Sequence, residues 1–89
     1  MEIEDINEVA NEIVSKYAPV HSQQDIKEVA NAVLNTTYSY RTIPGISEDT
    51  VKDDKKVREI LELLKQAGYV ESRKNKKGSD IWKSLYQQK

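Results

Sequence analysis

Several residue types that usually define a site are missing or nearly missing from this chain. It has no cysteine, no phenylalanine and a single histidine, His21. The absence of cysteine excludes disulfides, thiolate catalysis and cysteine-ligated zinc or iron–sulfur centres. A lone histidine with no second ligand near it argues against a metal site. We therefore expect no metal and no other cofactor.

Long hydrophobic runs are also missing. No window approaches the roughly 20 consecutive apolar residues that a transmembrane helix needs. The acidic start of the chain, with Glu2, Glu4 and Asp5, is the reverse of the basic head of a signal peptide. These features predict a soluble cytoplasmic protein with no membrane partner.

Catalytic arrangements are absent as well. The sequence has no Ser–His–Asp set and no glycine-rich phosphate loop, and the adjacent carboxylates Asp53 and Asp54 would point about 100° apart on a helix. Two such side chains cannot clamp one ion or share one proton without help. We expect no enzymatic activity and no catalytic residues.

What remains is a small, charged chain whose charge is unevenly distributed. Its 89 residues fit one domain, residues 1–89, and only 37% of them are hydrophobic, which predicts a thin core of Ile, Val, Leu, Tyr and Trp. Residues 1–50 hold three basic and nine acidic side chains, whereas residues 51–89 hold eleven basic and six acidic ones. This polarity indicates a basic face for a polyanion and an acidic face turned away from it.

Two amphipathic helices are predicted in the first half of the chain. Apolar residues recur at helical spacing over residues 4–17, and Ala18-Pro19 ends that pattern. Ser22, with Asp25 three residues later, is a start signal for a second helix. Residues 4–14 and 24–34 are similar to each other, through duplication or through convergence on one amphipathic pattern.

The middle of the chain predicts a strand followed by helix. Residues 37–43 are rich in β-branched and aromatic residues, which favours a short strand, and Pro44-Gly45 indicates a turn. Ser47 is the expected cap of the next helix, with Ile46 packing against Val51. Two solutions are open from there: one helix over residues 47–67, or a helix near 46–52, a break at Asp53-Asp54 and a helix over 54–67. We favour the break because it gives the order helix, strand, helix, helix, strand, loop, strand from residue 22 onward.

The last third of the chain predicts a helix followed by a β-hairpin. A leucine-rich amphipathic pattern over residues 57–67 stops at Gly68, which suits the left-handed position that commonly ends a helix. Two short strands follow, joined by the polar loop 74–80, and Trp82 on the return strand is expected in the core. The predicted class is mostly α with a small antiparallel hairpin (α+β).

The spacing Val57-x-x-Ile60-Leu61-x-x-Leu64-x-x-x-Gly68-Tyr69-Val70, with the basic hairpin after it, resembles the winged helix-turn-helix family of DNA-binding domains. The resemblance implies a winged-helix core over residues 22–86 and an extra N-terminal helix, residues 4–17. We expect that extra helix to expose an apolar stripe, which makes a homodimer through residues 4–17 the expected assembly.

The resemblance also implies a function. The helix before Gly68 would lie in the major groove of double-stranded DNA, and the hairpin 73–77 would lie along the phosphates. Such a protein would be a small transcriptional regulator, associated with the nucleoid. The implied DNA-binding residues are those able to neutralise phosphates or to read base edges: Lys52, Lys55, Lys56, Arg58, Arg73, Lys74, Asn75, Lys76 and Lys77.

One departure from the family pattern supports an alternative. Glu59 and Glu62 are expected on the exposed face of the predicted recognition helix, where phosphates would repel them, and the sequence pI of about 5.8 is low for a DNA-binding domain. The alternative function is a protein-interaction module of a replication or transcription assembly, built on the same fold.

Overall fold

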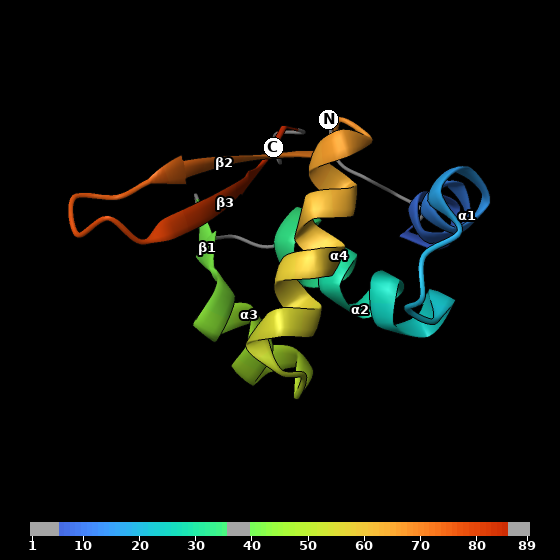
Figure 1. Ribbon diagram of the computed structural model, residues 1–89, viewed down its shortest axis with the longest axis horizontal. Helices are drawn as coiled ribbons and strands as arrows, with labels where there is room; N and C mark the ends of the chain where they lie inside the picture. Colours follow the sequence, from blue (N-terminus) through green and yellow to red (C-terminus); the bar gives the residue numbers. More distant parts are fainter. Residues whose placement is uncertain (1–5, 36–39, 86–89) are drawn as a thin grey trace.

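The structure is a computed structural model that describes residues 6–35 and 40–85. In this part of the chain it contains four helices and a three-stranded antiparallel sheet (Figure 1). The elements follow the order α1 (Ile6–Tyr17), α2 (Gln23–Leu34), β1 (Arg41–Thr42), α3 (Ile43–Thr50), α4 (Asp54–Gln66), β2 (Val70–Lys74) and β3 (Asp80–Ser84). The strands lie in the order β1-β3-β2. The predicted α+β class is confirmed.

One hydrophobic core joins all four helices and the sheet. The apolar stripe of α4 is fully buried, through Val57, Ile60, Leu61 and Leu64. From the sheet, Val70 and Trp82 are each 1% exposed and pack into the same cluster. The prediction that Trp82 belongs to the core is confirmed.

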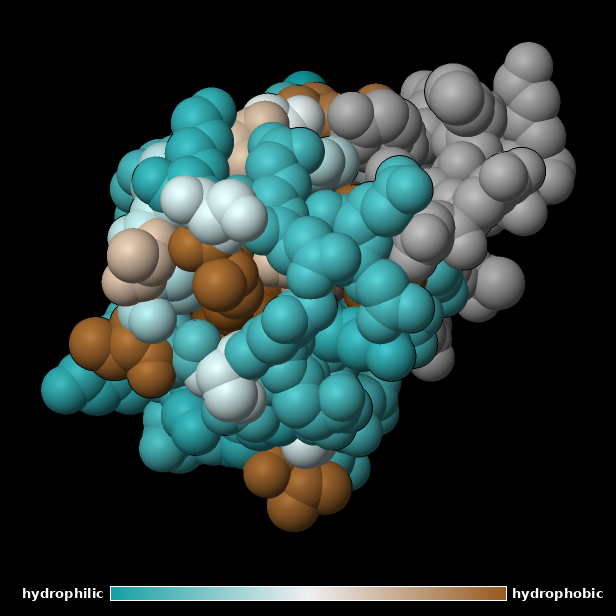
Figure 2. Space-filling view, turned by 90° about the vertical axis from the view of Figure 1, so that its right-hand side faces the viewer, coloured by the Kyte–Doolittle hydropathy of each residue, from teal (hydrophilic) through white to brown (hydrophobic). Residues whose placement is uncertain are grey.

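The first helix is part of this core, which corrects the premise for a homodimer. The apolar side chains Ile6, Val9, Ala10 and Ile13 are buried because α1 packs on α2 and touches α4. The coloured part of the α1 side of the molecule is mainly hydrophilic, with hydrophobic atoms in small separate areas (Figure 2). The expected exposed stripe is therefore wrong for residues 6–17, since the chain covers it itself; residues 4 and 5 lie outside the described part.

The second helix begins as predicted. Ser22 is its N-cap, and the Ser22 hydroxyl accepts a hydrogen bond from the backbone N–H of Asp25 at 3.1 Å. This bond satisfies one of the backbone donors that a helix start leaves without an intrahelical partner.

The start of α3 differs from the prediction. Thr42, not Ser47, is the N-cap, and its hydroxyl accepts from the N–H of Gly45 at 3.2 Å. Pro44 and Gly45 form the first turn of the helix instead of a separate turn, because proline lacks only an N–H that a first turn leaves unpaired anyway. Ser47 is consequently buried inside α3.

The extent of the predicted strand also changes. Only Arg41 and Thr42 form β1, pairing with Trp82 and Ile81 of β3, and Tyr40 is 51% exposed outside the strand. Ile43, the last residue of the predicted strand, is instead the first residue of α3. Residues 37–39 of the prediction lie outside the described residues.

The chain breaks between α3 and α4, as we favoured. Val51 takes a left-handed conformation, with a φ of 57°, and ends α3. Its side chain is 90% exposed, so the predicted contact with Ile46 is wrong. Asp53 then caps α4 by accepting from the N–H of Lys56 at 2.7 Å.

Gly68 ends α4 in the way the sequence predicts. It has a φ of 89°, and two hydrogen bonds close the helix: Gly68 N–H to the Lys65 carbonyl at 3.1 Å, and Tyr69 N–H to the Leu64 carbonyl at 3.0 Å. This pair of bonds defines a Schellman motif. Because the motif fixes the exit of the chain, it directs β2 away from α4.

The hairpin is longer than predicted and its loop is shorter. Lys74 and Asp80, both expected in the loop, are a cross-strand pair, which leaves residues 75–79 as the loop. The register places Val70 opposite Ser84 and Ser72 opposite Trp82, so these four residues share the face that meets the helices. The outward face carries Glu71, Arg73, Ile81 and Lys83.

A cluster of ion pairs holds the break between α3 and α4 against α2. The Lys52 ammonium lies 2.9 Å from Asp25 Oδ1 and 2.6 Å from Glu28 Oε1, and the Lys56 ammonium lies 3.0 Å from Asp25 Oδ2. The Lys52 side chain is only 9% exposed. Hydrogen bonds from Lys52 and then Lys56 lower the pKa of Asp25 to about 2.

This pKa predicts an acid-dependent contribution to stability. The pKa of Asp25 falls from 3.8 when unfolded to about 2 when folded, so its contribution is present above pH 4 and is lost as the pH falls from 4 to 2. Asp25→Asn should lower the free energy of unfolding at pH 7 by about 1–2 kcal/mol, allowing for solvent screening.

Urea denaturation of wild type and Asp25→Asn at pH 7 and pH 2.5 measures this contribution. The control is Glu48→Gln, which removes an exposed carboxylate of α3 that makes no ion pair with a described residue. An Asp25→Asn effect of the same size at both pH values would contradict the assignment.

The Schellman motif predicts a cost for any side chain at Gly68. No atom lies within 4 Å of a Cβ built at this position, so the cost of Gly68→Ala is backbone strain without a steric clash. We expect a loss of about 1 kcal/mol in the free energy of unfolding, and a smaller loss for Gly68→Asn, since asparagine tolerates the left-handed region. Chemical denaturation of the two variants tests this order, and a greater loss for asparagine would refute it.

Candidate nucleic-acid interface

A cleft of about 700 Å³ lies between the start of α3, the N-terminal half of α4 and the hairpin. The hairpin projects to one side of α4 (Figure 1). The residues that line the cleft are Thr42, Ile43, Pro44, Asp54, Lys55, Arg58, Lys74, Asn75, Gly78, Ser79 and Asp80.

Four of the nine predicted DNA-binding residues line this cleft: Lys55 and Arg58 from α4, and Lys74 and Asn75 from the hairpin. The fold thus brings together cations that are up to 19 positions apart in sequence. Arg73, Lys76 and Lys77 lie beside the cleft on the same hairpin and are exposed.

The remaining two predicted residues face another way. Lys52 and Lys56 point to Asp25 and Glu28 of α2, in the ion-pair cluster described above. Lys52 is nearly buried there, whereas the Lys56 side chain remains 39% exposed. Their spacing in sequence gave no sign of this, because the acidic partners come from a helix more than twenty residues earlier.

Asp80 is the functional candidate that the sequence reasoning missed. Its Oδ1 lies 2.9 Å from the Lys74 ammonium, and its Oδ2 accepts from Arg58 Nη1 at 3.1 Å. Hydrogen bonds from Lys74 and then Arg58 lower the pKa of Asp80. The available signal was the position of an acid next to a basic loop, at the first residue of the return strand and opposite a lysine.

Asn75 shapes the loop of the hairpin. Its side-chain Oδ1 accepts from the backbone N–H groups of Lys77 at 2.9 Å and Ser79 at 3.0 Å. Its own N–H donates to the Ser79 carbonyl, and its carbonyl accepts from Gly78, which has a φ of 82°. An asparagine that reads adenine uses its amide oxygen as well as its nitrogen. Because the loop already uses the oxygen of Asn75, we assign this residue a structural role.

The glutamates of α4 lie outside the cleft. Glu59 Oε1 is 2.8 Å from Nε2 of His21, whose side chain is 10% exposed in the connection between α1 and α2. Glu62 and Gln66 are exposed further along α4 and do not line the cleft. These two glutamates therefore do not line the cleft, but two other carboxylates, those of Asp54 and Asp80, do.

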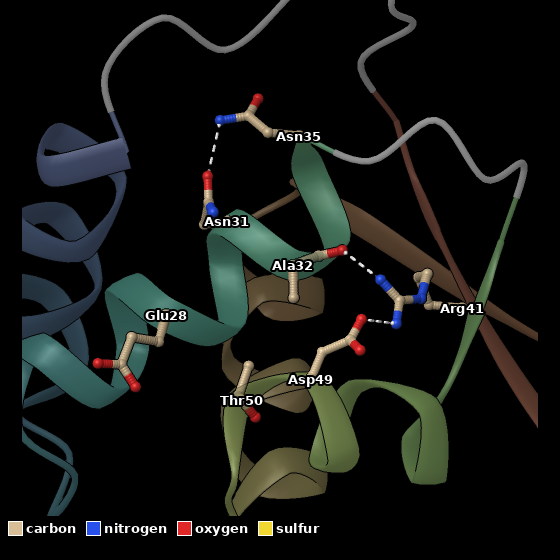
Figure 3. Close-up of a pocket in the computed structure, with 7 residues that line it drawn as sticks. All are labelled: Glu28, Asn31, Ala32, Asn35, Arg41, Asp49 and Thr50. Atoms are coloured by element: carbon tan, nitrogen blue, oxygen red, sulfur yellow. Dashed lines mark hydrogen bonds and ion pairs between the residues drawn. The ribbon is translucent and has the colours of Figure 1, made fainter.

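Arg41 is committed to contacts within the domain. Its guanidinium pairs with Asp49 and donates to the Ala32 carbonyl at 3.3 Å, between the end of α2 and α3 (Figure 3). It lines a second, smaller pocket of about 360 Å³, together with Glu28, Asn31, Ala32, Asn35, Asp49 and Thr50. Arg41 thus forms a salt bridge inside the domain.

The described residues contain neither a metal-binding cluster nor a membrane-spanning helix. Within residues 6–35 and 40–85, no group of three or more His, Asp or Glu side chains is arranged to hold a metal ion. None of the helices in that part of the chain is long and apolar enough to cross a membrane.

The chain was also compared with known proteins. No family model, no curated protein and no solved structure matches it. The site must therefore be interpreted from its own geometry.

The loop assignment of Asn75 predicts a specific pattern of variants. Asn75→Ala removes the acceptor of two backbone N–H groups and should lower the free energy of unfolding by about 1 kcal/mol. Asn75→Asp keeps an acceptor oxygen and should stay close to wild type. Thermal unfolding of both variants tests the assignment, and an equal loss in the two would contradict it.

Proposed function

We propose that this chain is a winged helix-turn-helix DNA-binding protein that contacts a duplex through the N-terminal half of α4 and the basic hairpin. The observation that carries the proposal is the cleft in which Lys55 and Arg58 of α4 meet Lys74 of the hairpin. A helix and a hairpin that present cations to one open cleft suit a ligand with a continuous line of negative charge.

The order of the elements supports the proposal. From α2 onward the chain runs helix, strand, helix, helix, strand, strand, and the short β1 pairs with β3 next to the hairpin. This is the order that the family resemblance implies, with α4 in the place of the recognition helix. The α1 helix is an addition that packs on α2 and is tied to the α4–β2 junction by a 2.5 Å hydrogen bond from the Tyr69 hydroxyl to Glu12.

The distribution of paired and unpaired cations supports it further. Lys55, Lys76 and Lys77 are exposed, and none of them makes an ion pair with another described residue. Cations of this kind can neutralise phosphates and release counterions without first breaking a contact of their own. A DNA-binding protein of this size would act as a small transcriptional regulator.

The alternative, a protein-interaction module, depended on the acidic residues of α4 and of the first half. Glu59 is paired with His21 away from the cleft, and Asp25 and Glu28 are paired with lysines. Three of the acidic residues that suggested a protein partner thus have partners inside the domain. We therefore favour DNA.

Fluorescence anisotropy of a labelled mixed-sequence duplex at several salt concentrations tests the proposal. Replacing Lys55, Lys76 and Lys77 together by alanine should weaken binding more than about tenfold at 0.1 M salt. The slope of log K against log salt should become shallower by about 0.9 for each lysine that contacts a phosphate.

A charge-matched control is available in the same chain. Lys16, Lys27 and Lys65 lie outside the cleft and off the hairpin, so their combined replacement by alanine removes the same charge from positions outside the proposed contact surface. We expect a much smaller change in slope. Equal effects of the two triple variants would refute the claim that DNA binds at the cleft. Absence of binding by the wild-type protein at low salt would refute DNA binding altogether.

A further inference from the structure

Asp80 presents a physical contradiction if the cleft binds a polyanion. A carboxylate at that place repels phosphates, and it occupies two cations that could otherwise bind them. Its side chain is 22% exposed, compared with 54% for Arg58 and 70% for Lys74, so it lies beneath the two cations that it pairs with. An asparagine in place of Asp80 would give the cleft a higher affinity for a polyanion.

The cations near the cleft fall into two groups. Lys55, Lys76 and Lys77 make no ion pair with any residue of the described part, and phosphate contact demands little of their geometry. Arg58 is different, because its Nη1 is fixed on Asp80 and its side chain is still half exposed. An arginine held in this way keeps other N–H groups free and has less conformational entropy to lose when it binds.

A fixed arginine on the N-terminal half of a recognition helix suits base reading. Residues in that part of a recognition helix are the ones that contact base edges in the major groove. The commonest specific contact is a bidentate one from arginine to O6 and N7 of guanine, and its two parallel bonds require a set orientation of the guanidinium. Asn75, the other predicted base reader of the cleft, is used by the loop.

From these observations we infer that Arg58 reads guanine in the major groove and that Asp80 is a positioning residue, which holds Arg58 for this contact and keeps it and Lys74 off the phosphates. Asp80 thereby lowers the affinity for DNA of any sequence and raises the discrimination between sequences. The inference rests on the proposed DNA-binding function and adds the base that the site recognises.

Replacing guanine N7 tests this directly. Wild-type protein selects its preferred duplexes from a random library, and binding is then measured to one selected duplex, to the same duplex with 7-deazaguanine, and to a mixed-sequence duplex. The 7-deaza base pairs normally but lacks the N7 acceptor. For wild type we expect the substitution at the contacted guanine to weaken binding about tenfold.

The variants separate positioning from a merely structural role. Asp80→Asn should bind the mixed-sequence duplex several-fold more tightly. The ratio of its affinities for the selected duplex and for the same duplex with 7-deazaguanine should fall toward one. Asp80→Glu, which keeps the carboxylate, should restore part of the ratio. Arg58→Lys keeps the charge but loses the planar bidentate geometry, so its ratio should fall below that of wild type while its mixed-sequence affinity stays close to wild type. Thermal melting of each variant shows whether it is folded. If Asp80→Asn does not fold, the Arg58→Lys variant still tests the contact with guanine.

Three results would overturn the inference and leave the DNA-binding proposal intact: a wild-type ratio of one at every guanine, an unchanged ratio in Asp80→Asn, or an equal weakening of all three duplexes by that variant. Absence of wild-type binding to any duplex is a separate outcome, because it removes the proposed function itself.

Discussion

The break between α3 and α4 sets the direction of α4, and the arrangement of the cleft depends on that direction. A continuous helix would carry Lys55 and Arg58 along the axis of α3, away from the hairpin. Three features make the break: the left-handed Val51, the Asp53 cap, and Lys52, which is held between Asp25 and Glu28. A lysine with a 9% exposed side chain between two carboxylates is strongly constrained, since leaving any one of these charges unpaired would be costly.

The basic half of the chain therefore serves two purposes. Lys52 and Lys56 stabilise the packing of α4 on α2, while Lys55 and Arg58, on another side of the same segment, face the open cleft. Net charge by region could not separate these groups, although it did indicate which half of the chain carries the basic face. The separation arises because neighbouring positions on a helix point in different directions, and only the packed structure shows which direction is inward.

Sequence patterns predicted the features that depend on local chemistry. The Ser22 cap and the end of α4 at Gly68 each follow from side chains within a few residues of the feature, and each is confirmed. The break before α4 is also confirmed, but local side chains left it open and the element order decided it. The burial of Trp82 follows from its size and its place on a strand. The predicted start of α3 was wrong because Pro44-Gly45 is compatible both with a turn and with a first helical turn, and because the competing cap, Thr42, is also among the preferred cap residues.

Features that depend on distant partners were not predictable in this way. The apolar stripe of α1 gave no indication of whether a second copy or α2 covers it. The ion pair of Lys52 with Asp25 joins residues more than twenty positions apart, and that of Asp80 with Lys74 joins residues several positions apart. The cleft was predictable only in part. Its cations were expected from the basic hairpin and helix, but the acid that links them was treated as part of a polar loop.

The anchoring of the hairpin changes along its length, and this bears on how the cleft could accommodate DNA. At its base, Val70 and Trp82 are buried in the core, so the start of β2 and the middle of β3 are fixed to the helices. Toward the tip the side chains become exposed, and the Arg58–Asp80 pair is the contact that joins this end of the sheet to α4. Segments with few buried apolar contacts open at lower cost than core strands. In the proposed complex Asp80 stays on Arg58 while Arg58 contacts guanine, so the pair keeps the ends of the two strands against α4. The loop beyond Asp80 is then the part of the hairpin that is free to follow a phosphate backbone.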